Sequence, residues 1–484
     1  MKVELLWRDG REGAGAAGDF GRDPATIELP AGAACVVTGQ QAGVLTGPLL
    51  TLLKAARAVS LARELSERSR RPVVPTFWIA ADDHDLDEIH HTFVVNKSGE
   101  VQKLRLELSG ARGAAGAVAV PADAAQRWID ELWSAAGIDA AALPPDPFRP
   151  RAGDTLSTWF ARCLGFLFEG RGLVLVEPAQ FGAAARPVFE RALRDDGAIA
   201  RALKEGGEAL RARGITPPLP IEEEPPLFWI EPGARTRIRR RGDSARGTEF
   251  LIGERVVARA ELLAHCGPGL PRLSANVALR PIVQAACLPA IAYVAGPHEL
   301  LYYEQLRPLH ALFGVPFPAL VARPQATLLS VVAARALRKL GLPASELFAA
   351  LDAHAKAATS ATTSPLLARG EQLRGEVARY VGELLESSPS VKAAAARRAA
   401  QLDQSFAGLL ERAAAALSEG EKVADLRWSA LANLVRPRGE PQERLLNALP
   451  FFAEQGPALI DALLTLRGEP RADRLVPHSL LVPD

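Results

Sequence analysis

A strand–loop–helix–strand pattern between residues 35 and 80 constrains the fold more than any other feature of this chain. A β-branched run at 35–37 ends in a glycine loop at 38–43, and Pro48 then opens a long helical pattern. The run at 72–80 is almost uniformly apolar, as a parallel strand covered on both faces requires. The pattern therefore predicts a βαβ unit.

Two further strand-like runs, at 172–176 and 291–295, extend this unit, and each ends in a polar or glycine-containing turn. Together they predict an open α/β sheet. The region near 222–270 differs because proline and then arginine are frequent there, and we expect an inserted hairpin region. Its arginines suit a solvated edge strand, with an anion site as the alternative. They are Arg235, Arg237, Arg239, Arg240 and Arg241.

Helical periodicity dominates the chain after residue 325. Apolar residues recur at heptad-like spacing in two seams, 366–384 and 402–416, and a Ser-Pro-containing break at 387–390 separates them. The seams predict an antiparallel helical hairpin, and their spacing leaves open whether they pair two subunits or pack within one chain. We expect two domains, an α/β core at 1–325 and a helical coiled-coil domain at 326–484.

Charge and cysteine content narrow the function classes. The 484 residues carry 57 basic and 56 acidic side chains, which argues against nucleic acid or an anionic membrane as partner. Four scattered cysteines without a CxxC pair argue against a disulfide framework and a structural zinc site. No signal peptide or membrane span is evident in the sequence, so we expect a cytoplasmic protein.

The glycine loop is the first candidate site. Glycines let backbone amides approach a ligand closely, and Pro48 at the first helical position would leave the helix N-terminus facing a phosphate or carboxylate. The alternative is a turn that only reverses the chain. The candidate residues are Thr38, Gly39, Gln40, Gln41, Gly43 and Gly47.

An acidic, histidine-rich segment at 82–91 is the second candidate, directly after the apolar strand that ends near Trp78. Open α/β sheets bind ligands at this position. Hydrogen bonds to a sugar, general acid–base chemistry by His84 and a magnesium ion held by carboxylates are the three possible uses. The carboxylates are those of Asp82, Asp83 and Asp85. An acidic helix start is the alternative, and it accounts for Asp87 and Glu88.

A third candidate combines two later segments. One contains Asn276, Arg280 and Gln284, and the other is a Gly-Pro turn followed by a helix. The second segment contributes Gly296, His298, Glu299, Tyr302 and Tyr303. Aromatic residues at this spacing are by default core and rim residues of a helix. Because polar groups follow several strands, we nevertheless expect all three candidates to share one cleft.

These segments together resemble the bacillithiol synthase family. The similarity rests on residues 37–48, on 77–85, on Asn276 with Arg280 and Gln284, on 296–302, and on 442–447. It implies a Rossmann-like core related to class I nucleotidyltransferases, inserted segments, and a coiled coil that pairs two subunits as a homodimer. The implied reaction joins the carboxylate of L-cysteine to the amine of glucosaminyl-malate and gives bacillithiol.

The resemblance also implies roles for the candidates. His84, Asp83, Asp85 and Glu299 become catalytic residues, the other candidates bind substrate or nucleotide, and ATP with Mg²⁺ would activate the carboxylate. Two departures stand out: His298 occupies a position where we expect glycine, and Gln40 and Gln41 lie where nucleotidyltransferases carry two ATP-binding histidines. The alternative function is a non-catalytic, nucleotide-binding coiled-coil scaffold, which would not need the polar residues at 82–91.

Overall fold

The computed structural model describes residues 2–5, 25–28, 30, 32–108, 111–244, 247–265, 272–359, 365–387, 392–467 and 478–481. Its contacts divide the chain into two units, residues 1–330 together with 435–484, and residues 331–434. The segment after 435 thus belongs with the α/β unit, whereas the expected division assigned it to the helical domain. Hydrogen bonds from Asn447 to the carbonyls of Leu45 and Gly47 show the reason, because they tie this segment to the first βαβ unit.

A five-stranded parallel sheet forms the centre of the first unit, in the order β14-β13-β3-β4-β7. Its strands are β3 (Ala34–Gln40), β4 (Val73–Ile79), β7 (Val174–Val176), β13 (Ala290–Ala295) and β14 (Ala319–Ala322). Helix α1 (Leu50–Ser69) connects β3 to β4. The predicted α/β sheet and its βαβ unit are confirmed.

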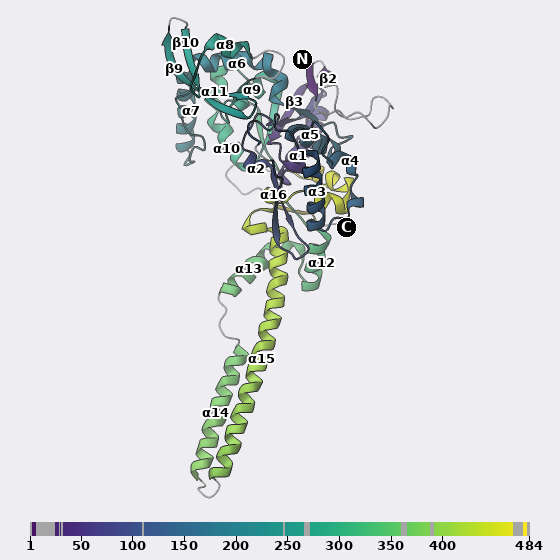
Figure 1. The fold of residues 1–484 in the computed structure, drawn as a ribbon, viewed down its shortest axis with the longest axis vertical. Coiled ribbons are helices and arrows are strands. Elements are labelled where there is room, and N and C mark those ends of the chain that lie inside the picture. Colours follow the sequence, from purple (N-terminus) through teal and green to yellow (C-terminus); the bar gives the residue numbers. More distant parts are fainter. Residues whose placement is uncertain are drawn as a thin grey trace. The chain divides into compact units, whose positions relative to one another are not determined.

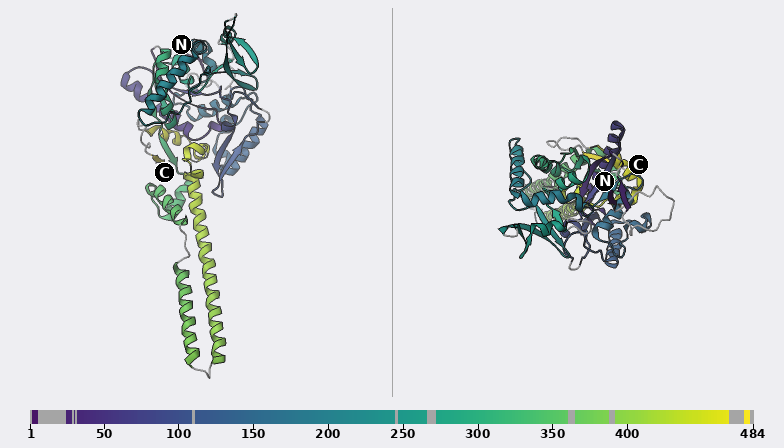
Figure 2. Two further views of the ribbon diagram at one scale, coloured as in Figure 1. Left: turned by 90° about the vertical axis from the view of Figure 1, so that its left-hand side faces the viewer. Right: turned by 90° about the horizontal axis from the view of Figure 1, so that it is seen from above.

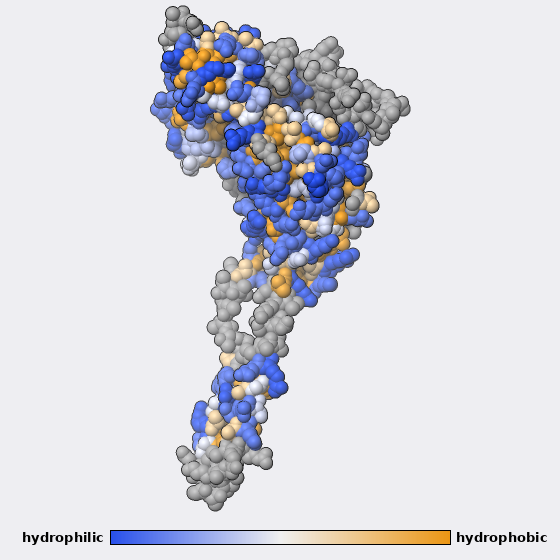
Figure 3. Space-filling model, in the orientation of Figure 1, coloured by the Kyte–Doolittle hydropathy of each residue, from blue (hydrophilic) through white to orange (hydrophobic). Residues whose placement is uncertain are grey.

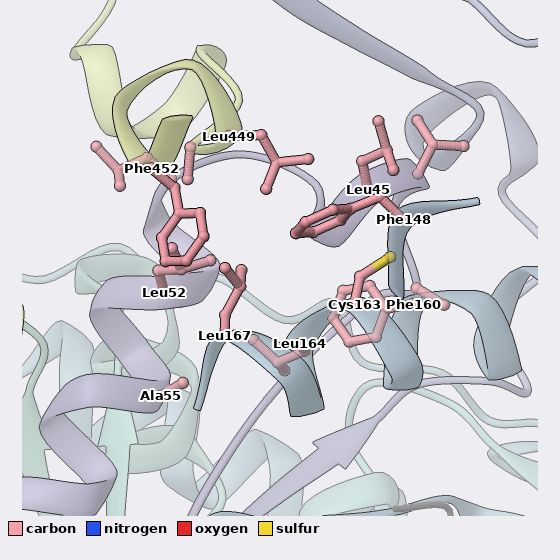
Figure 4. Packing of buried hydrophobic residues seen from close by; sticks show 14 of the residues in the cluster. Leu45, Leu52, Ala55, Phe148, Phe160, Cys163, Leu164, Leu167, Leu449 and Phe452 are labelled. Carbon is pink, nitrogen blue, oxygen red and sulfur yellow. The ribbon is translucent and has the colours of Figure 1, made fainter. Parts of the chain in front are cut away.

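Apolar residues cover both faces of this sheet. On one face α1 packs with α5 (Leu156–Leu167), α17 (Leu449–Gln455) and α18 (Pro457–Thr465), and Figure 4 shows Leu52 and Phe452 in this cluster. Each fully buried leucine or phenylalanine contributes about 1.5–3 kcal/mol to stability. Burial on both faces explains why the strand sequences are apolar without alternation.

A second five-stranded sheet, entirely antiparallel, follows in the order β11-β10-β9-β8-β12. Its strands are β8 (Leu227–Glu231), β9 (Ala234–Ser244), β10 (Gly247–Ile252), β11 (Arg255–Ala258) and β12 (Leu273–Ala275). The arginine-rich strand β9 lies between β8 and β10, so the prediction of a solvated edge strand is wrong. Carboxylates offset its charge instead, as in the ion pairs of Arg237 with Glu222 and Arg240 with Asp196.

Shorter elements complete the first unit (Figure 1). The strands are β1 (Lys2–Leu5), β2 (Ala25–Glu28), β5 (His91–Val95), β6 (Val101–Arg105), β15 (Gln325–Leu328) and β16 (His478–Leu481). The helices are α2 (Leu86–Ile89), α3 (Ala122–Ala136), α4 (Pro145–Phe148), α6 (Gly182–Arg194), α7 (Asp196–Arg211), α8 (Arg259–Ala264), α9 (Arg280–Cys287), α10 (Pro297–Gln305), α11 (Arg307–Phe313) and α16 (Gln442–Leu445).

The second unit is helical. It contains α12 (Val331–Leu340), α13 (Leu347–Thr359), α14 (Pro365–Ser387) and α15 (Lys392–Val435). Figures 1 and 2 show α14 and α15 side by side, and Arg374 donates to both carboxylate oxygens of Asp403 at 2.8 and 2.9 Å. The predicted antiparallel hairpin is confirmed, although residues 388–390 of the expected break lie outside the described part.

Several seam residues remain exposed along this hairpin. Leu373 is 43% exposed and Tyr380 is 62% exposed, and Figure 3 shows apolar side chains among charged ones along α14 and α15. The two helices of one chain therefore do not bury the whole of the apolar seams. Across the described residues, helices that combine the length and the apolar character needed to cross a bilayer are absent.

Candidate active site

A cleft of about 680 Å³ opens where the parallel sheet, the antiparallel sheet and the C-terminal segment of the first unit meet. The three candidate segments converge there, as expected for polar groups at the carboxyl ends of strands. Eleven of the predicted site residues line the cleft: Gly39, Gln40, Gln41, Trp78, Asp82, Asp83, Asn276, Arg280, Gly296, His298 and Glu299.

The loop after β3 is held tightly against β4. A side chain at Gly39 would place its Cβ 2.6 Å from the carbonyl oxygen of Trp78, so only glycine fits without a shift of the backbone. Gln41 extends from this loop, and its Nε2 donates to Asp83 Oδ2 at 2.9 Å and to Glu88 Oε2 at 2.8 Å. The loop thus fixes the position of the acidic segment after β4.

A buried ion pair joins two walls of the cleft. Lys54 Nζ on α1 lies 2.5 Å from Glu299 Oε2 on α10, and it also donates to the carbonyl of Gly39. Glu299 accepts further bonds from the amide of Gly296 and the hydroxyl of Tyr293. Burial alone would raise the pKa of Glu299, but the Lys54 ammonium and these donors hold that pKa below its ordinary value. Glu299 is therefore an anion with several fixed donors.

Lys54 was not among the predicted site residues. One sequence feature could have indicated Lys54: it is a single lysine in the middle of the apolar run 49–56, where helix α1 is buried on nearly all sides. Buried charges in proteins are normally paired or bound to a ligand, so a lysine at such a position indicates a polar site nearby. Sequence alone did not show that its partner would be Glu299.

The expected anion site at the start of α1 has a structural explanation instead. The amide of Leu49 donates to the carbonyl of Leu446, and Asn447 Nδ2 donates to the carbonyls of Leu45 and Gly47. These contacts engage the Leu49 amide and hold the C-terminal segment against the loop before α1, while Leu50, the first residue of α1, lines the cleft. The glycine at 43 packs closely on Gly47, and Thr38 Oγ1 donates to the carbonyl of Val294. Thr38, Gly43 and Gly47 are thus packing residues that do not line the cleft.

The acidic segment contributes two carboxylates to the cleft. Asp83 accepts from Gln41 and from the backbone amides of His84 and Asp85. Burial would raise the pKa of Asp83, but the Gln41 bond and the Arg235 charge hold that pKa below its usual value. Asp85 is exposed, precedes α2 and does not line the cleft.

His84 is placed differently from what a general base requires. Its Nδ1 lies 3.1 Å from Arg235 Nη1, and because the guanidinium can only donate, this nitrogen acts as the acceptor. The ring is exposed and does not line the cleft. The geometry therefore supports a role in positioning Arg235 better than a role in proton transfer.

The third candidate segment builds a tyrosine-lined wall. Asn276 Oδ1 accepts from the amides of Ala278 and Leu279 just before α9, and Arg280 at the start of α9 donates to the Tyr302 hydroxyl at 2.6 Å. Tyr303 lies between Tyr293 and Tyr302 in a stack, with ring centroids 4.3 and 5.3 Å away. The Tyr303 hydroxyl donates to Gln284 Oε1. Tyr302, Tyr303 and Gln284 thus lie behind the cleft wall and support it.

Six charged residues of the cleft, in addition to Lys54, were not predicted as site residues. Arg235 donates to Ser274 Oγ and to the carbonyl of Ala275, and its guanidinium lies 4.0 Å from the centre of the Phe228 ring. Arg237 forms a bidentate pair with Glu222. Arg323 and Glu443 form a buried pair at 3.2 Å. Besides Lys54, the overlooked charged residues that line the cleft are Glu222, Arg235, Arg237, Arg323, Glu443 and Arg444.

Several residues expected to face ATP and magnesium have partners inside the protein. The Leu49 amide donates to Leu446, and the described residues contain no group of three or more His, Cys, Asp or Glu that could hold a metal ion. Asp82 instead accepts from Ser274 Oγ at 2.6 Å, and Asp83 is bound by Gln41. The use of ATP with Mg²⁺ therefore stays a prediction.

Two family models match the chain along most of its length. Residues 26–324 match the N-terminal Rossmann-like domain of bacillithiol biosynthesis BshC, and residues 326–473 match its C-terminal coiled-coil domain. The chain belongs to the BshC family. The BshC match confirms both the resemblance seen in the sequence and the fold class, a Rossmann-like α/β core with a helical coiled-coil region.

Curated BshC proteins are similar over nearly the whole chain. "Putative cysteine ligase BshC" of Koribacter versatilis is 32% identical over 92% of this chain and 84% of its own length. The proteins of the same name from Salinibacter ruber and Geobacillus kaustophilus are 32% and 30% identical over 94% and 89% of this chain, and over 83% and 82% of their own lengths. These BshC relatives support an enzyme of the ligase class over the non-catalytic scaffold.

Proposed function

We propose that the cleft joins the carboxylate of L-cysteine to the amine of glucosaminyl-malate and so forms bacillithiol. The observation that carries this proposal is the density of fixed charges in one cleft of a BshC family member. Lys54, Glu299, Arg323 and Glu443 are held by buried ion pairs, and Asp82 and Arg280 face the same space. The ion pairs fix the walls of the cleft, and the charges of Asp82 and Arg280 suit substrates that carry both an ammonium group and carboxylates.

The reaction needs an activated carboxylate. A carboxylate does not condense with an amine in water at a useful rate, so we propose ATP with Mg²⁺ as the co-substrate that activates cysteine. An activated cysteine donor supplied by another enzyme is the alternative source. The chain's own residues would bind and orient cysteine and the amino sugar. Orienting two substrates in this way alone supplies a large share of the rate enhancement of a two-substrate reaction.

The exposed seams of α14 and α15 support a homodimer. Leu373, Val377, Leu402 and Leu409 are all more than one-third exposed although they follow the predicted heptad spacing. A second copy of the hairpin would cover these side chains, as a and d residues are covered in coiled coils. The cytoplasmic location expected from the sequence remains a prediction.

One experiment tests the proposed function. Purified protein is incubated with L-cysteine, glucosaminyl-malate and MgATP, and the product is examined by mass spectrometry for the new amide and its thiol. The proposal expects the amide to form together with AMP and pyrophosphate. Release of ADP and phosphate would indicate a different activation, and amide formation without nucleotide consumption would show that ATP is not the activating co-substrate.

A further inference from the structure

Most charges of the cleft are already neutralised inside the protein. Lys54 pairs with Glu299, Arg323 with Glu443, and Arg237 with Glu222. Arg235 lies 4.0 Å from Asp83 and is satisfied further by Ser274 and the carbonyl of Ala275. Most polar atoms of these groups are already engaged, and Glu443 Oε2 and Arg237 Nε are the exceptions among them.

Arg280 is different. Its guanidinium faces the cleft, and its one described hydrogen bond goes to the neutral hydroxyl of Tyr302 at 2.6 Å. Within the described part of the chain, no carboxylate comes within ion-pair distance of this side chain. A guanidinium has five N–H donors and is costly to bury without an anion. The carboxylate of Glu299 acts on Arg280 by its charge, but its oxygens are bound by Lys54, Tyr293 and the amide of Gly296. Arg280 therefore keeps donors for an anion that a ligand brings.

Asp82 supplies the opposite charge. Its Oδ2 accepts from Ser274 Oγ at 2.6 Å, and Ser274 in turn accepts from Arg235, so the carboxylate is held in one orientation. Among the described side chains, Asp82 has no cation as an ion-pair partner. It therefore presents a negative charge to the cleft.

A small niche lies between these two groups. Asp82, Ser274 and Arg280 line it on the polar side, and the ring of Trp78 with Phe189 and Val283 forms the apolar side. Its volume is about 10 Å³, close to the room that a single water-sized group requires. An ammonium, a carboxylate and one small side-chain group are the three features of a small α-amino acid.

We propose that Asp82 and Arg280 form the subsite for the α-amino acid substrate. The Asp82 carboxylate binds its ammonium group and the Arg280 guanidinium binds its carboxylate. This inference rests on the proposed function for the identity of the amino acid, L-cysteine. The amine of the amino sugar must stay free to attack, so an ammonium group held by Asp82 is better suited to cysteine than to the sugar.

Isothermal titration with cysteine and two analogues tests the subsite. The analogue 3-mercaptopropionate lacks the ammonium group, and cysteamine lacks the carboxylate. Wild-type protein should bind cysteine at least about tenfold more tightly than either analogue, since a hydrogen-bonded charge typically contributes that much or more. Titrations are run with and without glucosaminyl-malate, so that ordered binding does not conceal the result.

Variants separate the two groups. Asp82→Asn should remove the preference for cysteine over 3-mercaptopropionate while affinity for 3-mercaptopropionate changes less than about threefold. Arg280→Gln should remove the preference for cysteine over cysteamine, and Arg280→Lys should restore part of it if Gln weakens folding. Asp130→Asn is the matched control, because Asp130 is exposed on α3, accepts from Gln126 and does not line the cleft, and it should keep both preferences.

Two results would overturn the subsite: wild-type preferences that persist in Asp82→Asn, or cysteine binding that Asp130→Asn weakens as much as Asp82→Asn does. The turnover assay keeps the two proposals apart. If wild-type protein makes the amide but Asp82→Asn keeps its preference, the subsite alone is wrong. If cysteine binds through Asp82 and Arg280 but no amide forms with the amino sugar, the proposed ligase reaction alone is wrong.

Discussion

The ammonium of Lys54 lies 2.5 Å from the carboxylate of Glu299, and this buried contact joins the first helix of the α/β core to the helix after β13. Removing one partner leaves a buried charge without compensation. Glu299→Gln should therefore lower the free energy of unfolding by about 3–5 kcal/mol, measured by denaturant titration. The double variant Lys54→Met with Glu299→Gln should recover part of that loss.

The exposed pair of Arg307 and Glu304 is the matched control for this prediction. Pairs of this kind contribute about 0–1 kcal/mol, so Glu304→Gln should have a small effect. Equal losses of stability for Glu299→Gln and Glu304→Gln would show that burial of the Lys54 pair does not strengthen it.

Glu177, directly after β7, gives the α/β unit a pH dependence. Burial raises the pKa of its carboxyl from 4.5 to about 7, and the charge of Asp82 adds to this effect. The folded state then binds more protons than the unfolded state between these two values, so the free energy of unfolding should fall as pH rises from about 4.5 to 7. The shift corresponds to roughly 3 kcal/mol.

Glu177→Gln removes the titration while keeping the shape of the side chain. It should leave stability near pH 4.5 almost unchanged and raise it at pH 8, which flattens the pH profile of denaturant unfolding. A variant whose profile parallels that of the wild type would show that Glu177 titrates normally in the folded protein.

Substitution of Gly39 tests whether the close contact between β3 and β4 requires a glycine. Gly39→Ala would force its Cβ against the carbonyl of Trp78, and we expect a loss of about 1–3 kcal/mol in the free energy of unfolding. Gly207→Ala in helix α7 is the control, because its Cβ would meet only ordinary contacts of 3.5–3.6 Å. It should be neutral or stabilising by up to about 1 kcal/mol. Similar losses at both positions would contradict the role assigned to Gly39.

His84 tests the distinction between positioning and proton transfer. Because its Nδ1 accepts from Arg235, we expect His84→Gln to lower turnover less than about tenfold and to leave the pH dependence of turnover unchanged. Loss of a true general base typically costs about 10²–10⁴-fold. A loss of that size, together with a changed basic or acidic limb of the pH profile, would restore His84 as the general base.

The hairpin seams test the homodimer. The double variant Leu373→Glu with Val377→Glu places charge on exposed seam positions of α14. It should give monomers by light scattering, with the α/β core still folded. Arg369→Glu, at an exposed charged position of the same helix, is the control and should leave the mass unchanged. A mass that stays the same in the seam variant would assign the seams to packing within one chain.

Local patterns predicted the fold well because the decisive signals are short. The β-branched run before Gly39, the apolar run ending at Trp78 and the glycine-containing turns all act within a few residues, and each is present in the structure. The same logic failed for strand β9. Strand order depends on partners far away in the sequence, and nothing near Arg235 indicates that β8 and β10 lie on either side.

The site was predictable only in part for the same reason. Convergence of strand ends follows from parallel topology, so Asp82, Asn276 and Glu299 were correctly expected in one cleft. The loop before α1 is held by Asn447, about four hundred residues later in the chain, and no local signal shows it. Tertiary contacts likewise decide whether a charged group is already paired. Arg237 is paired with Glu222, whereas Arg280 donates to the neutral hydroxyl of Tyr302.

The most direct test of the central claim follows the oxygen atoms of cysteine. In the proposed ligase reaction one carboxylate oxygen leaves with the activating group when the amine forms the amide. Wild-type protein is given glucosaminyl-malate, MgATP and cysteine labelled with ¹⁸O at both carboxylate oxygens. It should yield an amide that retains one labelled oxygen, and an equal amount of AMP that carries the other. A folded protein that binds cysteine but forms no labelled amide under these conditions would contradict the account.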